Sequence, residues 1–249
     1  ESPATPLVRR LHARLATTVI AISRATAAPF EGARARVVQI HDGVAMPSVA
    51  TGRTLGSPLR LTVVGAVDRN KGQDVAVRSA AMLIERGLDV TVDLVGPIPD
   101  PAFAGEVADL AGQLGLGSRL RWRGEVPDPD AAFAEADLVL VPSRGETLSL
   151  VAIEALARRL PLVASGVGGL LDVVRDGETG VLVPPGDARG FADGVAQIAA
   201  DPRRADAMAS RGREDVARRF DVRGSVEALR LEIERTLAEM GGPSGGAIR

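Results

Sequence analysis

Two carboxylates, Glu146 and Glu154, lie around the expected start of an otherwise apolar helix. The aliphatic run Leu138–Val141 before them predicts a strand, so the segment is read as strand, loop and helix. A charge on so apolar a helix is costly unless something satisfies it. Two carboxylates and the free N–H groups of a helix N-terminus, gathered in one crevice, suit a ligand that carries hydroxyls and phosphates. A role for Thr147 or Ser149 as a plain helix cap is the structural alternative and is compatible with such a site.

A single lysine, Lys71, stands among 29 arginines. It lies two residues after Arg69 in a polar loop that follows an expected strand ending at Gly65. Cationic side chains in the first loop after a strand suit a diphosphate, and a glycine there allows close backbone approach. Lys and Arg are not interchangeable at a tight site, so the lone lysine favours a need for a compact ammonium. An ordinary polar loop, with a lysine kept by chance, is the alternative.

The composition excludes several classes of site. The chain of 249 residues has no Cys and two His, which rules out disulfides, thiolate metal sites and a Cys nucleophile and disfavours a His-rich zinc site. Its net charge of −2 lacks the excess of positive charge that is typical of nucleic-acid-binding proteins. No apolar segment reaches the roughly 18 residues of a spanning helix, and no signal peptide is recognisable, although the chain begins at Glu1 rather than Met. We expect a cytoplasmic protein.

Short apolar runs alternate with helical patterns along most of the chain. This alternation predicts an α/β fold, a Rossmann-like doubly wound parallel sheet with helices on both faces. The expected strands are 19–22, 37–40, 59–65, 90–96, 120–123, 138–142, 162–165 and 180–183. The expected helices are 6–15, 73–86, 103–114, 130–136, 150–158, 170–174, 188–200, 203–219 and 226–240. Ligands of such sheets bind at the carboxyl ends of the strands.

Three further segments have ordinary structural interpretations. Asp128-Pro129-Asp130 is similar to a D-x-D metal motif, but it leads into a helix, where Asp is expected as a cap. The stretch 166–169 lacks the spacing of a dinucleotide fingerprint and predicts a tight turn from strand to helix. The stretch 41–43, which includes His41, ends a strand just before a Pro- and Gly-containing linker, which favours a hinge over catalysis.

An ordered set of segments resembles the retaining GT-B glycosyltransferases, in particular their family four of nucleotide-sugar transferases. The resemblance runs from about residue 17 to residue 221, and its central feature is the E-x7-E spacing of Glu146 and Glu154. The other matching segments are 19–23, 40–44, 64–65 with 71–72, 94–96, 123–126, 136–137, 142–143, 160–164, 168–169 and 176–187. The E-x7-E spacing alone is weakly specific, whereas the ordered set is strong.

The resemblance implies the organisation of the chain. Members of that family have two Rossmann-like domains with the active site between them. By analogy, residues 1–46 would be an incomplete C-terminal remnant of the acceptor domain and 47–57 a linker. Residues 58–221 would be the nucleotide-sugar donor-binding domain, and 222–249 a C-terminal helix with a flexible tail. The rest of the acceptor domain would be supplied in cis or by a partner chain, and that half would be the route to any peripheral membrane contact.

The resemblance also implies roles for individual residues. Glu146 and Lys71 would be catalytic, with Lys71 neutralising the donor diphosphate and Glu146 facing the hydroxyls of the donor sugar. Glu154 would hold the ribose hydroxyls. The family usually has Arg where this chain has Ala66, and Arg69 would reach the phosphates in its place.

The remaining donor contacts would come from two short segments. Phosphate or sugar would be held by the backbone of Leu148, Ser149, Leu150 and Val151. The pocket for the base would be lined by Gly124, Glu125 and Val126. The family usually has Gly-Phe-Gly between its glutamates, whereas this chain has Thr147-Leu148-Ser149, so the sugar contacts would differ in detail.

The implied reaction is transfer of a sugar from a nucleoside-diphosphate sugar to an unidentified acceptor with retention at the anomeric carbon. It would need no metal ion and no cofactor other than the donor itself. Two alternatives stay open. The chain could be a non-catalytic nucleotide-sugar-binding subunit that needs a partner for activity, or a sugar-nucleotide epimerase, against which the E-x7-E spacing and the lone lysine argue.

Overall fold

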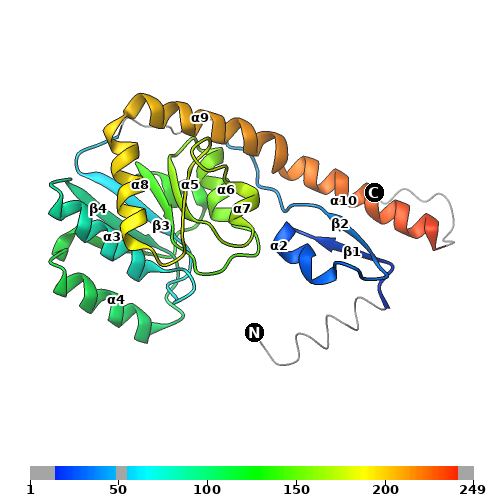
Figure 1. Ribbon diagram of the computed structural model, residues 1–249, viewed down its shortest axis with the longest axis horizontal. Helices are drawn as coiled ribbons and strands as arrows, with labels where there is room; N and C mark the ends of the chain where they lie inside the picture. The colour runs from blue at the N-terminus through cyan, green and yellow to red at the C-terminus, as the bar shows by residue number, and fades with distance from the viewer. Residues whose placement is uncertain (1–14, 49–54, 241–249) are drawn as a thin grey trace.

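A computed structural model describes residues 15–48 and 55–240, and its centre is a parallel sheet of six strands with helices on both faces (Figure 1). The strands are β3 (Leu59–Val64), β4 (Val90–Val95), β5 (Leu120–Gly124), β6 (Leu138–Val141), β7 (Leu162–Ser165) and β8 (Val181–Val183). Their spatial order is β5-β4-β3-β6-β7-β8, the order of dinucleotide-binding folds. The chain therefore reverses its direction of winding between β3 and β6, and ligands of such sheets bind at that switch point.

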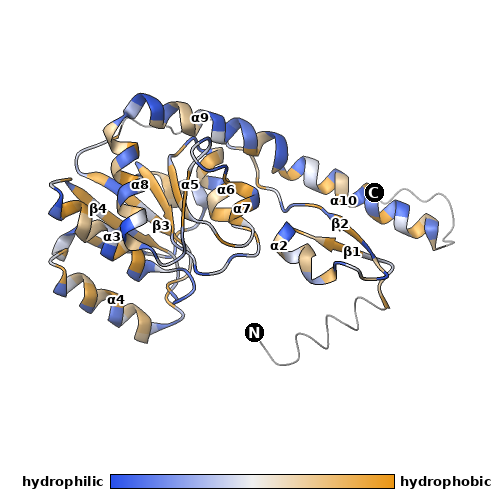
Figure 2. Ribbon diagram, viewed as in Figure 1, coloured by the Kyte–Doolittle hydropathy of each residue, from blue (hydrophilic) through white to orange (hydrophobic). Residues whose placement is uncertain are grey.

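Two apolar clusters lie on opposite faces of the sheet. One packs the sheet against α3 (Gln73–Glu85), α4 (Pro101–Gln113) and α8 (Ala188–Ala200). The other packs it against α5 (Pro129–Phe133), α6 (Leu150–Ala157), α7 (Leu170–Val173) and the end of α9 (Pro202–Arg219). In the central strands β6 and β7, successive residues serve the two clusters in turn, so these strands are hydrophobic along their whole length. Figure 2 shows the apolar residues concentrated in the sheet. The predicted Rossmann-like fold is confirmed.

The expected elements agree with the described ones to within a few residues. Three short helical elements were not predicted: α2 (Arg24–Ala27), η1 (Ala28–Phe30) and η2 (Gly117–Arg119). They are too short to show a helical period, and α2 is held by a capping box between Ser23 and Thr26. The expected helix 6–15 apart from Leu15, residues 49–54 of the linker, and the tail from 241 lie outside the described residues.

A small parallel pair of strands precedes the large sheet. β1 (Thr18–Ala21) and β2 (Arg36–Gln39) pair with each other, and we call residues 18–39 the N-terminal unit. α10 (Val222–Glu239) packs against it: Arg36 forms an ion pair with Glu232 at 2.5 Å, and the hydroxyls of Thr18 and Thr236 are 3.1 Å apart. No helix in the described ranges combines the length and the apolar content that a bilayer crossing needs.

The chain crosses between the N-terminal unit and the large sheet twice, once near Val44 and once between α9 and α10. These two connecting segments form hydrogen bonds with each other. The Val44 N–H donates to the carbonyl of Phe220 at 2.9 Å, and the Val222 N–H donates to the carbonyl of Val44 at 3.1 Å. His41 lies next to this crossing, with Nδ1 2.8 Å from the carbonyl oxygen of Ile22. The predicted hinge at 41–43 thus lies beside the crossing, and its motion stays a prediction.

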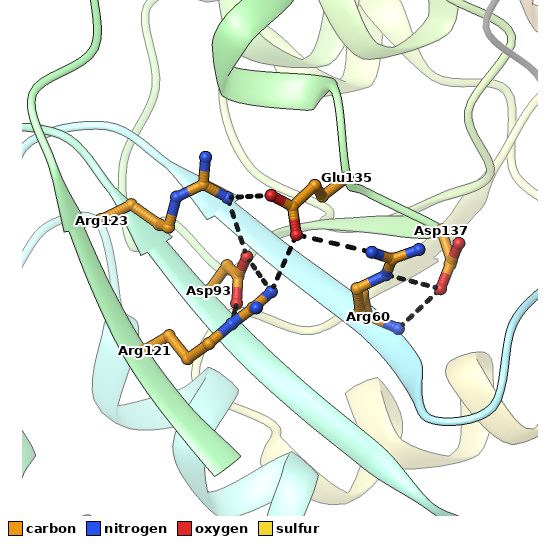
Figure 3. Close-up of polar contacts among 6 residues, drawn as sticks. All are labelled: Arg60, Asp93, Arg121, Arg123, Glu135 and Asp137. Atoms are coloured by element: carbon orange, nitrogen blue, oxygen red, sulfur yellow. Dashed lines mark hydrogen bonds and ion pairs between the residues drawn. The ribbon is translucent and has the colours of Figure 1, made fainter. Parts of the chain in front are cut away.

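Charged side chains replace apolar ones on the part of the sheet that the short α5 leaves open. They form one network (Figure 3) of Arg60, Asp93, Arg121, Arg123, Glu135 and Asp137. Arg121 donates to both oxygens of the buried Asp93 at 2.6 Å, and Glu135 lies 3.4 to 3.5 Å from all three guanidinium groups. Three positive and three negative charges thus pair with one another, although the buried Oδ1 of Asp137 has no hydrogen-bond partner among the described residues.

Gly72 at the start of α3 shows how closely the β3–α3 loop approaches β6. Its φ is +70°, and a Cβ built on it would lie 2.2 Å from the carbonyl oxygen of Pro142. Gly87, after the same helix, has a similar φ of +84° but open space around its Cβ position. An alanine at Gly87 would incur only the cost of a left-handed backbone, whereas an alanine at Gly72 would incur that cost and also clash with Pro142.

We expect Gly87→Ala to lower the free energy of unfolding by about 1 to 2 kcal/mol, the cost of a left-handed conformation for a residue with a Cβ. Gly72→Ala carries the same cost plus the clash with Pro142, so its loss should be clearly larger. Equilibrium unfolding in urea measures both variants. Equal losses would show that the loop can move away from β6 without cost.

Candidate functional site

The loops after β3 and β6 meet at the switch point of the sheet and bring Lys71 and Glu146 together. The Lys71 ammonium lies 2.7 Å from Oε1 of Glu146. The Glu146 side chain is 8% exposed and the Lys71 side chain 28% exposed, so the carboxylate is the buried partner and the ammonium still reaches solvent. Both residues line a small cavity at the ends of β3 and β6. The structure thus unites the two residues that were predicted to be catalytic.

Polar contacts clamp the two loops to each other beside this pair. The side-chain amide of Asn70 donates to the carbonyl of Gly145 at 3.0 Å, and the Arg144 N–H donates to the carbonyl of Asn70 at 2.7 Å. The Arg144 guanidinium donates to both carboxylate oxygens of Asp74, at 3.0 and 2.7 Å. These contacts fix the spacing of the two loops, and with it the backbone positions from which the Lys71 and Glu146 side chains extend.

Glu146 itself is held from two further sides. The Ser143 hydroxyl donates to its Oε1 at 2.9 Å, and the Gly169 N–H donates to its backbone carbonyl at 3.0 Å. Gly168, whose φ is +54°, packs so closely that an added Cβ would lie 1.9 Å from the same carbonyl oxygen. The sequence predicted a tight turn at 166–169, and that turn is present, but its contact with Glu146 was missed. No feature of the sequence pointed to Ser143 or Arg144 as supports.

The first turn of α6 faces the same end of the sheet. Ser149 is its N-cap, and its hydroxyl accepts from the Ala152 N–H at 3.4 Å, as the cap prediction required. Leu148 is buried, whereas Leu150 is 44% exposed. The first-turn N–H groups of an α-helix have no intrahelical partner, and they carry the positive end of the helix dipole. This turn can therefore accept an anion.

Glu154 lies one turn further along α6 and is half-buried. Burial raises the pKa of its carboxyl above the usual value of 4.5, and the nearby Arg158 offsets only part of that effect. Among the described residues, its carboxylate takes part in no hydrogen bond or ion pair. A half-buried carboxylate of this kind has unused acceptor capacity for a ligand with hydroxyl groups.

The other predicted contact residues end neighbouring strands. Gly65 lies under the Lys71 side chain, whose Cδ would be 3.7 Å from a Cβ on this glycine. Gly124 ends β5, and its carbonyl accepts from the Gly96 N–H at 2.8 Å, which ties the end of β5 to the end of β4. Glu125 is exposed and Val126 half-buried, two strands away from the Lys71–Glu146 pair.

Arg69 is the predicted residue that the structure sets apart from the pair. Its guanidinium forms an ion pair with Glu106 on α4 and lies 5.2 Å from the centre of the Phe103 ring. To reach a phosphate beside Lys71 it would have to leave these exposed contacts. The role of Arg69 therefore stays a prediction that needs a side-chain movement.

Known proteins are similar to this chain in sequence. A D-inositol 3-phosphate glycosyltransferase of Catenulispora acidiphila is 37% identical over 190 residues, which cover 70% of this chain and 46% of that protein. A D-inositol 3-phosphate glycosyltransferase of Corynebacterium diphtheriae is 38% identical over 157 residues, which cover 60% of this chain and 37% of that protein. The chain spans about half the length, or less, of the curated relatives it matches.

Solved structures share the fold over nearly the whole chain. A sucrose-phosphate synthase of Thermosynechococcus elongatus superposes with a TM-score of 0.84 at 27% identity, over 96% of this chain and 63% of that one. HepE of Anabaena, solved in complex with UDP-glucose, superposes with a TM-score of 0.84 at 24% identity, over 94% of this chain and 68% of that one. The sequence model of a family described as glycosyl transferases group 1 matches residues 58–201. This chain therefore belongs to the glycosyl transferases group 1 family.

Proposed function

We propose that this chain is the donor-binding half of a retaining glycosyltransferase that takes a sugar from a nucleoside-diphosphate sugar. The observation that carries the proposal is the Lys71–Glu146 pair at the switch point of the sheet, with the start of α6 and Glu154 beside it. A cation, a helix N-terminus and two carboxylates are the groups that a diphosphate linked to two hydroxyl-rich rings requires. HepE, a structural neighbour, was solved with UDP-glucose, which fits this ligand class.

The site would work mainly through fixed charge. Lys71 and the first turn of α6 would stabilise the diphosphate as it departs, because positive groups placed before the reaction do not have to reorganise during it. Glu146 would hold the hydroxyls of the donor sugar and Glu154 those of the ribose. The Lys71 ammonium would then share its present contact with Glu146 between that carboxylate and a phosphate oxygen.

The acceptor would bind outside the residues that carry this site. The matched relatives are about twice as long as the matched part of this chain, so an acceptor-binding half in cis or from a partner chain completes the proposal. A non-catalytic nucleotide-sugar-binding subunit is the second candidate, favoured by the same coverage of about half. Transfer by this chain together with its acceptor-binding half, followed by NMR of the product, separates the two and reports the anomeric configuration.

A screen of donors tests the proposal directly. UDP-, GDP- and ADP-sugars should be compared for the rise in melting temperature that they cause, because a ligand bound only by the folded state stabilises it. We expect one nucleotide class to stabilise the protein more than the other two. No stabilisation by any of them would contradict the proposed donor site.

Lys71→Ala should raise the dissociation constant of the selected nucleoside diphosphate about 10- to 100-fold. The reason is the loss of one charge-assisted contact, which contributes about 1.5 to 3 kcal/mol. Isothermal titration calorimetry measures the change. Arg78→Ala is the matched control, because Arg78 is an exposed cation on α3, the helix that follows the same loop. An unchanged affinity in Lys71→Ala, or an equal loss in the control, would remove Lys71 from the site.

Glu154→Gln should make the ligand-free protein more stable at neutral pH and weaken its nucleotide binding. The folded-state pKa of Glu154 is raised by burial, so the folded state binds more protons than the unfolded state in this range. The wild type therefore loses stability as the pH rises from about 4.5 through the raised value, whereas the Gln variant does not.

Urea unfolding at several pH values from about 4 to 7.5 checks this expectation. The stability difference between the variant and the wild type should grow from near zero at the acidic end and level off near neutrality. Glu214→Gln is the control, because Glu214 is an exposed carboxylate on α9. A difference that is independent of pH would show that burial does not penalise the Glu154 charge.

A further inference from the structure

A contact between the N-terminal unit and α7 lies outside the proposed donor site but is connected to it by hydrogen bonds. The Arg24 N–H donates to Oδ2 of Asp172 at 2.7 Å, and its side-chain Nε pairs with Oδ1 of the same carboxylate. Nη2 of Arg24 also donates to the carbonyl of Leu171 at 3.1 Å. The Asp172 side chain is 4% exposed and the Arg24 side chain 72% exposed. The buried carboxylate of Asp172, beside the large sheet, is thus paired with Arg24 of the N-terminal unit.

Asp172 is joined through α7 to the backbone that holds Glu146. The Asp172 N–H donates to the carbonyl of Gly169 at 3.0 Å, and the Gly169 N–H donates to the carbonyl of Glu146 at 3.0 Å. The chain of contacts therefore runs from Arg24 through Asp172 and Gly169 to Glu146. The first link consists of a backbone hydrogen bond and an ion pair, and each of the other two is a single hydrogen bond.

The last contact in this series, between Gly169 and Glu146, lies in closely packed backbone, so the two residues have little room to move independently. The Cβ position of Gly168 is 1.9 Å from the carbonyl oxygen of Glu146, and that of Gly169 is 2.2 Å from the carbonyl oxygen of Thr147. A shift of the first turn of α7 would therefore displace the loop that carries Glu146. Tightly packed elements transmit such shifts because they cannot deform continuously.

We propose that Arg24 is a positioning residue for Glu146, so that the placement of the N-terminal unit sets the carboxylate that faces the donor sugar. The inference rests on the proposed function, which gives Glu146 its role toward the sugar. It makes the donor side of the site sensitive to the unit that precedes it. Without the Arg24 side chain, the buried Asp172 carboxylate loses its ion-pair partner and keeps only the hydrogen bond from the backbone N–H of residue 24, so the tie between α7 and the N-terminal unit is weakened.

Amide hydrogen exchange tests the coupling without any ligand. In Arg24→Ala, exchange of the Gly169 N–H should become about three- to tenfold faster, because its bond to Glu146 opens more often. Exchange of the Gly96 N–H, which bonds to Gly124 at the far side of the sheet, should not change. Arg34→Ala is the matched control, because Arg34 is an exposed arginine in the same unit. Unchanged exchange at Gly169 would overturn the inference whatever the protein binds.

A calorimetric comparison tests the consequence for the donor. Arg24→Ala should reduce affinity for UDP-glucose about three- to tenfold more than affinity for UDP, since only the former engages Glu146. Arg24→Lys, which keeps the charge, should restore part of that difference, and a purely structural role would leave the ratio unchanged. An unchanged ratio would overturn the link to the sugar.

The two proposals fail in different ways. A wild type that binds no nucleoside diphosphate or nucleotide sugar contradicts the proposed function, whereas the exchange experiment still decides the coupling. If Arg24→Ala does not fold, as judged by circular dichroism, Arg24→Gln gives the same comparison because it keeps most of the side chain and removes the charge.

Discussion

The contact between the β3–α3 loop and the β6–α6 loop is the constraint on which the candidate site depends. The carboxyl ends of all strands in a parallel sheet lie at the same end of the sheet. The reversal of the winding direction between β3 and β6 leaves a crevice at that end. An ammonium from one loop and a carboxylate from the other meet there at 2.7 Å. Their attraction is useful only because the surrounding backbone fixes the geometry, since a part-buried ion pair in a loose frame would not repay its desolvation.

The fold and the centre of the site were predictable from the sequence for a simple reason. Alternation between short aliphatic runs and helical patterns survives in almost every element, because β6 and β7 are buried on both faces and most of the long helices bury one apolar face. Lys71 and Glu146 were predictable because their residue types are unusual for their surroundings, one as the lone lysine and the other as an acid close to an apolar helix. Both signals are local, and both were confirmed as neighbours in space.

The supports of the site were not predictable, because they act between distant parts of the chain. Ser143 and Arg144 look like ordinary loop residues, and only their partners give them a meaning. Arg24 and Asp172 are 148 positions apart, and no periodicity relates them. The charged face of β5 shows in the alternation of Arg121 and Arg123 with Leu120 and Trp122, but their partners Asp93 and Glu135 lie on other elements and could not be identified from that pattern.

The placement of α10 beside the N-terminal unit has a consequence for how the chain folds. The Thr18–Thr236 contact joins residues separated by 218 positions, so β1 and β2 are completed by a helix that follows the six-stranded sheet in the sequence. A pair of strands alone is at best marginally stable in water. The six-stranded sheet can close from contacts within its own segment, whereas β1 and β2 cannot pack against α10 until the whole intervening segment has been synthesised. Folding of the large sheet therefore brings together the two segments that stabilise each other beside it.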